Sequence, residues 1–234
     1  MPNKPKLPKG HLHPLTQTIT HAISILGDMG FETIEGPEVT SEWNNFDSVL
    51  VGKDHPARDT QDTFWTTDGR VLRTHTSAMQ VPAMTELGKK PPVRIIVPGR
   101  IYRNEATDAT HEATFYQLEG FVIDKEINMG HLVWTLKNFL NSMLKTDIEM
   151  KFYPHHFPYV ELGMEVMIKW RGKWLELLGS GLIHPDVIKN MKLDPKVWHG
   201  FAFGVGVDRL MMLERGIDDI RLTYSGDLRF LKQF

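Results

Sequence analysis

The stretch GRIYRNEATDATHEATFYQLEG, residues 99–120, decides the fold that we expect for this chain. It reads as two β-strands joined by a polar loop. Successive side chains of a strand point to opposite faces, so alternate residues of the two strands share a face. One face would then carry four polar or charged side chains and one aromatic ring, which is unusual for a sheet. These residues are Arg103, Glu105, Phe115, Gln117 and Glu119.

The composition is that of an ordinary globular protein, with 234 residues, 41% hydrophobic and 24% charged. A net charge of −2 gives no bulk electrostatic case for nucleic-acid binding, so such a contact must be local or made by another chain. The lack of cysteine excludes disulfides, zinc–thiolate sites and thiol chemistry. No apolar run approaches the roughly 18 residues of a membrane span, and the first residues lack the apolar core of a signal peptide. We expect a protein of the cytoplasm, or of an organelle matrix, with no membrane contact.

Hydrophobic periodicity predicts the elements around this stretch. Helices are expected at 15–29, ended by Gly30, at 129–144 and at 207–216, ended by Gly216. Strands are expected at 31–39, 93–100, 101–105, 114–123 and 200–206, and a hairpin at 165–170 and 173–178. Residues 1–10 are expected to form an extended arm and 41–70 to be irregular. Long strands joined by tight turns favour an α+β fold, an antiparallel sheet flanked by helices.

A dinucleotide-binding loop is disfavoured. Gly204 and Gly206 begin like the G-x-G-x-x-G fingerprint, but Arg209 stands where the third glycine belongs. Arg209 would lie in the first turn of a helix, where backbone N–H groups attract anions and an arginine adds bidentate phosphate recognition. The alternative for Arg209 is a solvated surface arginine.

The histidines raise two further possibilities. His155 and His156 are adjacent, but no helical pair of the H-E-x-x-H kind occurs, so a metal site is disfavoured and most histidines are expected to be structural or solvated. His75 and Ser77 are close enough in sequence to form a nucleophile pair, but the G-x-S-x-G elbow is absent, which disfavours hydrolase chemistry.

The polar sheet face is the strongest signal, and Glu176 is expected to join it from the segment WLELL. Strongly apolar segments flank this face, and buried charges must be paired or must hold a charged ligand. The side chains suit an ATP-like ligand together with an ammonium group: arginine for phosphate, phenylalanine for a base, and Glu and Gln as acceptors for amines. A solvent-exposed face with no ligand is the alternative.

Longer strings carry a resemblance that runs in order along nearly the whole chain. They are GHLHPL (10–15), GFETIEGPEV (30–39), NNFDSV (44–49), KDHPARDTQDTFW (53–65), LRTHTSAMQ (72–80), PGRIYRNEATDATHEATFYQLEG (98–120), WLELLGSGLIHPDV (174–187), GFAFGVGVDRL (200–210) and DLRFLKQF (227–234). The chain resembles the catalytic module of the α subunit of bacterial-type phenylalanyl-tRNA synthetase, a class II aminoacyl-tRNA synthetase. The resemblance implies one class II catalytic domain over 11–234, with an antiparallel sheet flanked by helices.

The resemblance also implies roles for residues at the ATP end. Arg103 would bind the α-phosphate, Glu105 the adenine amino group, and Phe115 would stack on adenine. His111 and Arg209 would contact the outer phosphates, and Glu176 would help to hold Mg²⁺. Catalysis would rest on Arg103 and Arg209.

At the amino-acid end, the resemblance implies two groups of residues. Those around the α-amino group of the substrate are His75, Ser77, Gln117 and Glu119. Those forming the walls of the aromatic side-chain pocket are Phe157, Tyr159 and Ala202.

The implied activity is ATP-dependent conversion of phenylalanine to phenylalanyl-adenylate, followed by transfer to tRNA(Phe). The carboxylate nucleophile is already an anion, so positioning and charge stabilisation would suffice. The segment ending at Pro37 would form a subunit interface, with a β subunit in an αβ heterotetramer or with a second copy in a homodimer. Two alternatives remain: a paralogue or engineered variant that adenylates an aromatic amino acid without charging tRNA, and a non-catalytic nucleotide- or amino-acid-binding protein, which the intact Arg103, Glu105 and Arg209 disfavour.

The sequence departs from the family in three places. About ten residues precede the module, whereas the α subunit of the family carries a long helical arm that contacts tRNA. Tyr159 stands where the family has Phe, and Leu162 where it often has Pro, so a hydroxyl either finds a partner outside the pocket or changes what the pocket accepts. Asp208 replaces the usual Glu before Arg209.

Overall fold

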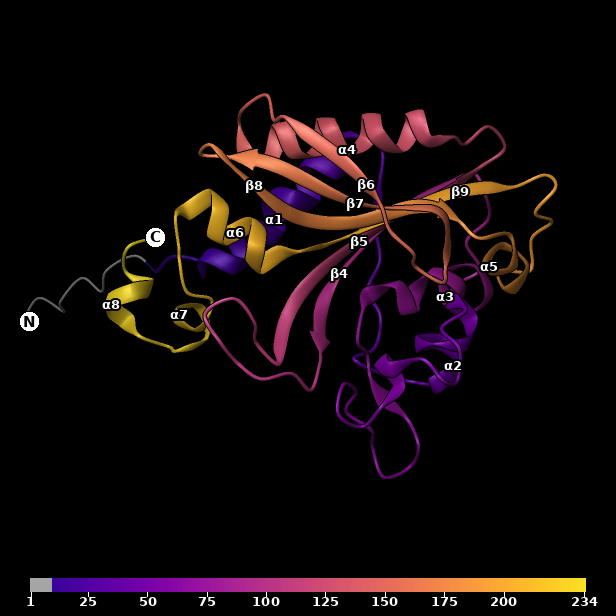
Figure 1. Cartoon of the computed structure of the whole chain (residues 1–234), viewed down its shortest axis with the longest axis horizontal. Helices are drawn as coiled ribbons and strands as arrows, with labels where there is room; N and C mark the ends of the chain where they lie inside the picture. Colours follow the sequence, from indigo (N-terminus) through magenta and orange to yellow (C-terminus); the bar gives the residue numbers. More distant parts are fainter. Residues whose placement is uncertain (1–9) are drawn as a thin grey trace, which may run out of the picture.

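A seven-stranded sheet organises the chain in the computed structural model, which describes residues 10–234 (Figure 1). In spatial order the strands are β1 (Glu32–Thr33), β4 (Val93–Tyr102), β5 (Thr114–Asp124), β9 (His199–Gly206), β8 (Lys173–Ile183), β7 (Val160–Trp170) and β6 (Met150–Pro154). β1 runs parallel to β4, and every other neighbouring pair is antiparallel. The predicted α+β fold, an antiparallel sheet flanked by helices, is confirmed.

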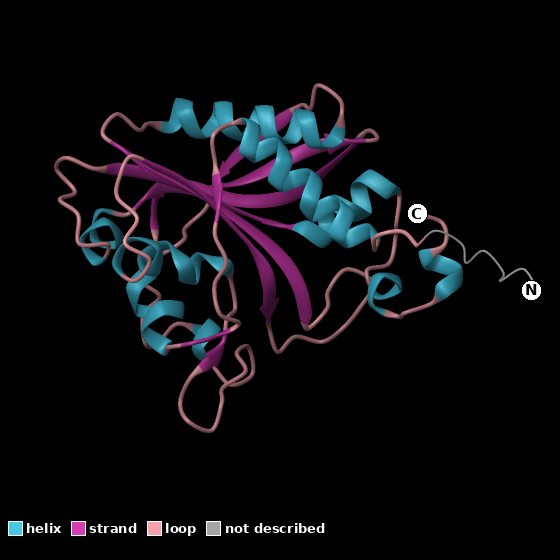
Figure 2. Cartoon of the chain, turned by 180° about the vertical axis from the view of Figure 1, so that it is seen from behind, coloured by secondary structure: helices cyan, strands magenta, loops and turns pink. Residues whose placement is uncertain are grey.

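Three helices cover one face of this sheet, α1 (Pro14–Asp28), α4 (Met129–Leu144) and α6 (Val207–Arg215) (Figure 2). Two residues stabilise the N-terminus of α1. Pro14 has a φ that suits the first helical position, and Nδ1 of His13 accepts a hydrogen bond from the N–H of Leu15 at 3.2 Å. The last turn gives way to Gly30 with φ +86°, a left-handed conformation that glycine adopts without strain. The helix ends where its apolar spacing predicts.

The main hydrophobic core lies between these helices and the sheet. Leu136 and Phe139 of α4 pack with Ile96, Leu118 and Phe203 of the sheet, and all five are fully buried or nearly so. Each such side chain stabilises the fold by about 1.5–3 kcal/mol on burial. This packed layer of helices supports the sheet from one side, and the residues on its other face project from that supported sheet.

The second face of the sheet is covered only at one end. There α3 (Gln80–Thr85) and α5 (Pro185–Asn190) contribute to a smaller core with the buried residues Ile95, Phe121 and Val187. The rest of this face, over β5, β9 and β8, stays open. The chain between β1 and α3 forms only short elements. They are α2 (Glu42–Asn45), 3₁₀ turns at Asp47–Val49, Pro56–Arg58 and Thr76–Met79, and a two-stranded sheet of β2 (Val39–Thr40) and β3 (Val71–Leu72).

Several expected elements differ in the structure. Residues 31–39 do not form one strand, because the chain leaves the main sheet after Thr33 and joins β3 at Val39. The strands expected at 93–100 and 101–105 are a single strand that ends at Tyr102, since its partner β5 begins at Thr114. Glu105 therefore lies in a loop and not on a strand. Arg103 keeps its predicted direction, because its N–H continues the ladder to the carbonyl of Ala113 at 2.9 Å.

The expected hairpin is longer than predicted, since β7 and β8 together span Val160–Ile183. Periodicity did not reveal β6, α5, or the short C-terminal helices α7 (Arg221–Tyr224) and α8 (Leu228–Leu231). Within residues 10–234, no helix combines the length and apolar character needed to cross a membrane. The extended arm predicted for 1–10 lies outside the described residues except for Gly10.

Candidate active site

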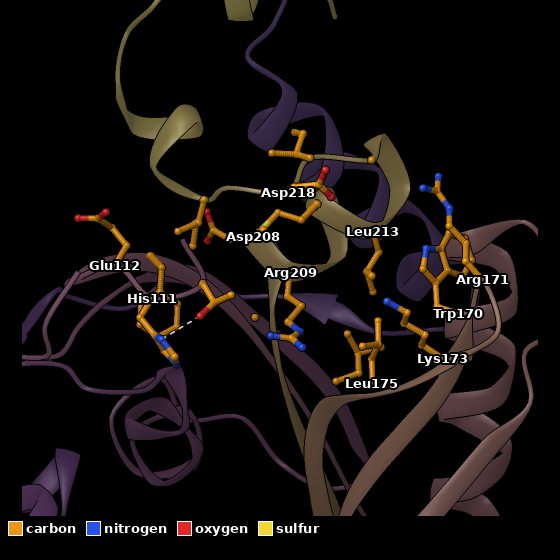
Figure 3. A pocket seen from close by; sticks show the side chains of 18 of the residues that line it. His111, Glu112, Trp170, Arg171, Lys173, Leu175, Asp208, Arg209, Leu213 and Asp218 are labelled. Carbon is orange, nitrogen blue, oxygen red and sulfur yellow. Dashed lines mark hydrogen bonds between the residues drawn. The ribbon is translucent and has the colours of Figure 1, made fainter. Parts of the chain in front are cut away.

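Two adjoining cavities lie on the open face of the sheet, and Arg103 lines both of them. The larger, of about 520 Å³, is bounded by the loop that follows β4, by α6 and by the β7–β8 hairpin (Figure 3). The smaller, of about 250 Å³, lies over β5, β8 and β9. Phe157 and Tyr159, from the segment between β6 and β7, close it on one side.

Glycines form the floor of the smaller cavity. Gly204 of β9 stands in register between Glu119 of β5 and Gly179 of β8. A Cβ on Gly204 would lie 2.5 Å from Nε2 of Gln117 and 2.9 Å from Oε2 of Glu119. The two polar side chains of β5 therefore occupy space that only a glycine on the neighbouring strand leaves free.

Arg103 is held at the junction of the cavities by the chain around it. Its Nε donates to the carbonyl of Thr74 at 3.2 Å, and its guanidinium lies 5.2 Å above the centre of the Phe115 ring. Thr74 is fixed in turn by the buried Asn45, whose side chain bonds both its N–H and its hydroxyl. Burial lowers the pKa of Arg103, and Glu105 opposes this shift. The guanidinium is thus a partly desolvated cation that forms no ion pair within residues 10–234, which suits an anionic ligand.

The larger cavity collects the remaining residues assigned to ATP. Phe115, Arg209, His111 and Glu105 all line it, and Figure 3 shows Arg209 between His111 on one side and Lys173 with Leu175 on the other. Arg209 is exposed and lies in the first turn of α6, as expected. The structure thus brings together five residues that the sequence scatters from position 103 to position 209.

The loop that carries His111 is shaped by Asp108. The Asp108 carboxylate accepts from the N–H groups of Thr110 at 2.6 Å and His111 at 2.8 Å, and lies 3.0 Å from Nδ1 of His111. These bonds hold the pKa of Asp108 well below its usual range, with the His111 side chain the largest cause. A further bond, from the N–H of Ile220 to the carbonyl of Ala109 at 2.9 Å, ties the loop to the segment after α6.

The carboxylate of Asp208, the residue before Arg209, links α6 to two other parts of the chain. Its Oδ2 accepts from the N–H of Tyr116 at 2.7 Å, and its Oδ1 accepts from the hydroxyl of Tyr224 at 2.6 Å. The side chain is buried, and burial raises its pKa above the usual value. Asp208 therefore joins the start of α6 to β5 and so fixes the place from which Arg209 projects.

Glu119 is the buried acid of the smaller cavity. Ser77 Oγ donates to its Oε2 at 2.9 Å and Gln80 Nε2 donates to its Oε1 at 2.6 Å. Burial raises the pKa of Glu119 to about 7, against the opposing effect of these two donors. Beside it, Oε1 of Gln117 is buried and has no hydrogen-bond partner within residues 10–234. A free acceptor next to a buried acid suits an ammonium ligand.

His75 and Ser77 lie behind the cavity and not along its wall. The His75 ring is 6.4 Å from the Tyr159 ring, and burial with the nearby Arg103 lowers its pKa to about 3, so it is neutral at pH 7. Ser77 directs its hydroxyl to Glu119 instead of to His75. The nucleophile pair considered from the sequence is therefore not formed.

The aromatic wall is built from Phe157 and Tyr159, which stack with ring centres 5.8 Å apart and planes 23° apart. Ala202 of β9 contributes a small buried side chain to the same cavity. Burial and the neighbouring Glu119 raise the pKa of Tyr159 above its usual value. In the described part of the chain its hydroxyl makes no hydrogen bond, so it is available to a ligand.

Glu176 reaches the smaller cavity through an irregularity in β8. Val166 and Met167 of β7 pair with Leu178 and Glu176, which leaves Leu177 as an extra residue. Residues 10–234 contain no group of three or more His, Asp or Glu side chains arranged to hold a metal ion. One exposed carboxylate is still consistent with Mg²⁺, which keeps several waters and binds through one or two carboxylates and substrate phosphates.

Sequence reasoning missed several residues that line the cavities or support their walls: Gln80, Glu165, Trp170, Arg171, Lys173 and Asp218. Gln80 follows a 3₁₀ turn, which has no apolar periodicity to place it. Arg171 lies in a hairpin turn and Lys173 directly follows it, where charged residues are ordinarily solvated, and only the pairing of β7 with β8 brings them to the site.

Comparison with known proteins places the chain in a family. The family described as "tRNA synthetases class II core domain (F)" matches residues 2–234. The alpha subunit of phenylalanine--tRNA ligase from Leptospira biflexa is 48% identical, over 98% of this chain and 70% of that protein. The corresponding subunit from Serratia proteamaculans is 45% identical, over 98% and 69%.

The fold also matches a solved structure. The pyrrolysyl-tRNA synthetase of Desulfitobacterium hafniense superposes with a TM-score of 0.73, over 93% of this chain and 75% of that one. At 20% identity this likeness concerns the fold alone. The sheet, the two cavities and the sequence relatives agree: the chain belongs to the class II tRNA synthetase core-domain family, together with the alpha subunits of phenylalanine--tRNA ligase.

Proposed function

We propose that this chain activates phenylalanine with ATP and transfers the resulting phenylalanyl group to tRNA(Phe), as the catalytic alpha subunit of a phenylalanine--tRNA ligase. The observation that carries the proposal is the position of Arg103 between a cavity of nucleotide size and a smaller one with an acid at one end and aromatic rings at the other. Such a residue stands where two reactants would meet. The identity of 45–48% to alpha subunits of that ligase supports the same activity.

In the larger cavity, adenine stacks on Phe115 and its amino group donates to Glu105. The phosphates extend along Arg103, His111 and Arg209, three side chains that line this cavity. Arg103 neutralises charge on the α-phosphate, and Arg209 and His111 contact the outer phosphates. Glu176, which lines the adjoining smaller cavity, would help to hold Mg²⁺, and the ion would supply further charge neutralisation when bound. Arginines fixed before the substrate arrives lower the barrier because little reorganisation remains.

In the smaller cavity, the ammonium group of phenylalanine meets Glu119 and the free oxygen of Gln117. The phenyl ring lies between Ala202 and the rings of Phe157 and Tyr159. Ring pairs of this kind contribute about 0.5–1.5 kcal/mol each beyond area burial. His75 and Ser77 do not line this cavity and support the ammonium site indirectly, Ser77 through its hydrogen bond to Glu119.

The reaction joins the two cavities at Arg103. A carboxylate oxygen of phenylalanine attacks the α-phosphorus of ATP and pyrophosphate leaves towards Arg209. The nucleophile is already ionised, so no general base is needed, and positioning supplies most of the acceleration. The terminal ribose of tRNA(Phe) then accepts the phenylalanyl group and AMP is released.

A β subunit is the proposed partner, in an αβ heterotetramer. The segment ending at Pro37 would contribute to the interface, and among residues 10–234 the edge strand β1 pairs only with β4. The exposed Trp43 lies on α2 and the exposed Leu87 lies just after α3, and the bond from Asn44 to Glu86 joins these two segments. Solution mass with and without a β subunit tests this, and a stable dimer of this chain alone would favour the homodimer instead.

Phenylalanine-dependent exchange of pyrophosphate into ATP tests the activation step. The assay is run over a panel of amino acids, with and without a β subunit. Exchange that requires phenylalanine is expected, and no exchange with any aromatic amino acid would refute the proposal. Charging of tRNA(Phe) by the same preparations is scored separately, because exchange without charging would leave activation standing and remove only the transfer step.

A further inference from the structure

The side chains of His155 and Glu165 form a close polar pair beside the aromatic wall of the smaller cavity. Nδ1 of His155 lies 2.7 Å from Oε1 of Glu165, and the His155 ring lies 4.5 Å from the centre of the Phe157 ring. Glu165 itself lines the cavity. We propose that this pair is a brace that holds Phe157 in the position that binds the aromatic ring of the amino acid; the inference rests on the proposed function.

The backbone brings the two members of the brace to the same face. Tyr153 pairs with Glu165 across β6 and β7, and the N–H of His155 continues the ladder to the carbonyl of Gly163 at 2.8 Å. Because side chains alternate along a strand, His155 points to the same side as Tyr153 and hence as Glu165. Glu165 also stands opposite Gly179 in β8, which brings its carboxylate to the cavity floor.

Phe157 is held on its other side by two glycines. A Cβ on Gly179 would lie 2.8 Å from Cζ of Phe157, and one on Gly163 would lie 3.2 Å from its Cδ2. The ring therefore rests against bare backbone on the sheet side. Phe157 lies in a segment between β6 and β7 and not on a strand, so its position depends on its contacts with the rings of His155 and Tyr159.

The brace acts through Phe157 and touches no reacting atom, which makes His155 and Glu165 positioning residues. A wall held in place lowers the free energy of bound substrate and transition state alike, so its loss raises KM and leaves kcat unchanged. The side chains of His155 and Glu165 are 43% and 30% exposed, which limits the effect. A pair of this exposure corresponds to at most about a fivefold change in KM, or 1 kcal/mol at 1.4 kcal/mol per tenfold.

Pyrophosphate exchange by the His155→Ala variant tests the brace, in the assembly that supports exchange by the wild type. We expect the KM for phenylalanine to rise about three- to fivefold, with kcat and the KM for ATP within twofold. His156→Ala is the matched control, because this neighbour is exposed and forms no hydrogen bond or ion pair in the described part of the chain. An unchanged KM for phenylalanine in His155→Ala would overturn the brace.

A double-mutant cycle with Glu165→Ala separates positioning from other roles of the cavity wall. In the His155→Ala background, Glu165→Ala should raise the KM no further, because the brace is already gone. Additive effects would overturn the proposal. So would a parallel loss of kcat, both KM values and melting temperature in His155→Ala, since that pattern marks a general structural role.

The brace also has a readout that needs no activity. The ¹³C resonances of the Phe157 ring should shift in both His155→Ala and Glu165→Ala and stay in place in His156→Ala. Unshifted resonances would overturn the brace even if the wild type shows no exchange. Absence of wild-type exchange alone would instead count against the proposed function, so the two failures are distinguishable.

Discussion

Ser77 Oγ donates to Oε2 of Glu119 across 2.9 Å, although 42 positions separate the two residues in the chain. Gln80 satisfies the other carboxylate oxygen. Burial nevertheless raises the pKa of Glu119 to about 7, so the acid is only half ionised near neutral pH. An arriving ammonium group would favour the ionised form, and binding of the amino acid is therefore coupled to release of a proton.

The affinity for phenylalanine should fall as the pH is lowered. Below pH 7 the free protein holds a proton on Glu119 that binding must displace. The dissociation constant is then expected to rise by up to about tenfold for each pH unit between 7 and about 5. Titration calorimetry in buffers of different ionisation enthalpy measures both the affinity and the released proton.

The Glu119→Gln variant is the control for this coupling. It keeps the shape of the side chain but has no proton to release, so its weaker affinity should not vary over the same pH range. A wild-type affinity that is equally flat would mean that Glu119 is ionised throughout.

Stability should depend on pH through the same group, in the opposite direction to an ordinary salt-bridged acid. The folded protein holds the Glu119 proton more tightly than the unfolded chain, whose pKa is near 4.5. The free energy of unfolding therefore falls as the pH rises from about 4.5 to 7, by about 3 kcal/mol, and is constant above. Urea titrations of the wild type and Glu119→Gln check this, and equal slopes in the two proteins would contradict it.

Replacing Arg103 by Ala should abolish exchange without unfolding the protein. Removal of a preorganised charge at the reacting phosphate is expected to lower kcat/KM by at least about 10²–10³-fold. Arg103 is a desolvated cation that forms no ion pair in the described part of the chain, so its loss should change the free energy of unfolding by no more than about 1 kcal/mol. Exchange kinetics and thermal melts measure the two quantities.

Arg94→Ala is the matched control, because Arg94 lies on the same strand β4 and is exposed. Its exchange activity should equal that of the wild type. A large loss of stability in Arg103→Ala would point to a structural role for the residue, and exchange that survives would remove it from the mechanism.

Gly204→Ala should damage the amino-acid side of the site selectively. The added Cβ would lie 2.5 Å from Nε2 of Gln117 and 2.9 Å from Oε2 of Glu119, so both side chains must move. Misplacement by about 1 Å costs about 10²-fold in rate, and kcat/KM for phenylalanine is expected to fall by that much. The KM for ATP should change little, since Gly204 does not line the larger cavity.

Gly27→Ala serves as the comparison for Gly204→Ala. Gly27 is exposed in α1 and a Cβ there meets nothing within 4 Å, so alanine should stabilise the helix by about 0.5–1 kcal/mol and leave kinetics unchanged. Unchanged activity in Gly204→Ala would mean that the floor of the cavity tolerates a side chain, and a similar loss in both variants would mean that the loss is not specific to the site.

The sequence could predict the parts of this molecule that follow a regular period. The stripe of α4 and the alternation of Phe115, Gln117 and Glu119 along β5 led to the helix, the strand and the polar face that the structure contains. The same alternation predicts Glu105 on a strand, and this prediction is wrong because β4 ends at Tyr102, opposite the first residue of its partner β5. Periodicity describes a strand but does not say where pairing stops.

The site depends on contacts that no local pattern encodes. The bond from Gln80 to Glu119 needs a 3₁₀ turn to lie against the sheet, and Glu176 reaches the cavity only because Leu177 is an extra residue in β8. The roles proposed for the site residues came from the ordered family strings, which record the tertiary arrangement indirectly. Departures from those strings, above all Tyr159, carry the information that is specific to this chain.

Tyr159 should tune which aromatic amino acids the site accepts. Its hydroxyl makes no hydrogen bond in the described part of the chain, while its ring stacks on Phe157 at the cavity wall. A hydroxylated substrate ring can pair with this group, and a hydrogen bond contributes about 0.5–1.5 kcal/mol, or about 2–10-fold. In Tyr159→Phe, kcat/KM for tyrosine or meta-tyrosine should fall by that factor relative to phenylalanine. Exchange assays with the three amino acids decide the matter: an unchanged ratio would mean that the hydroxyl points away from the substrate, and a rise in the ratio would mean that it excludes hydroxylated rings.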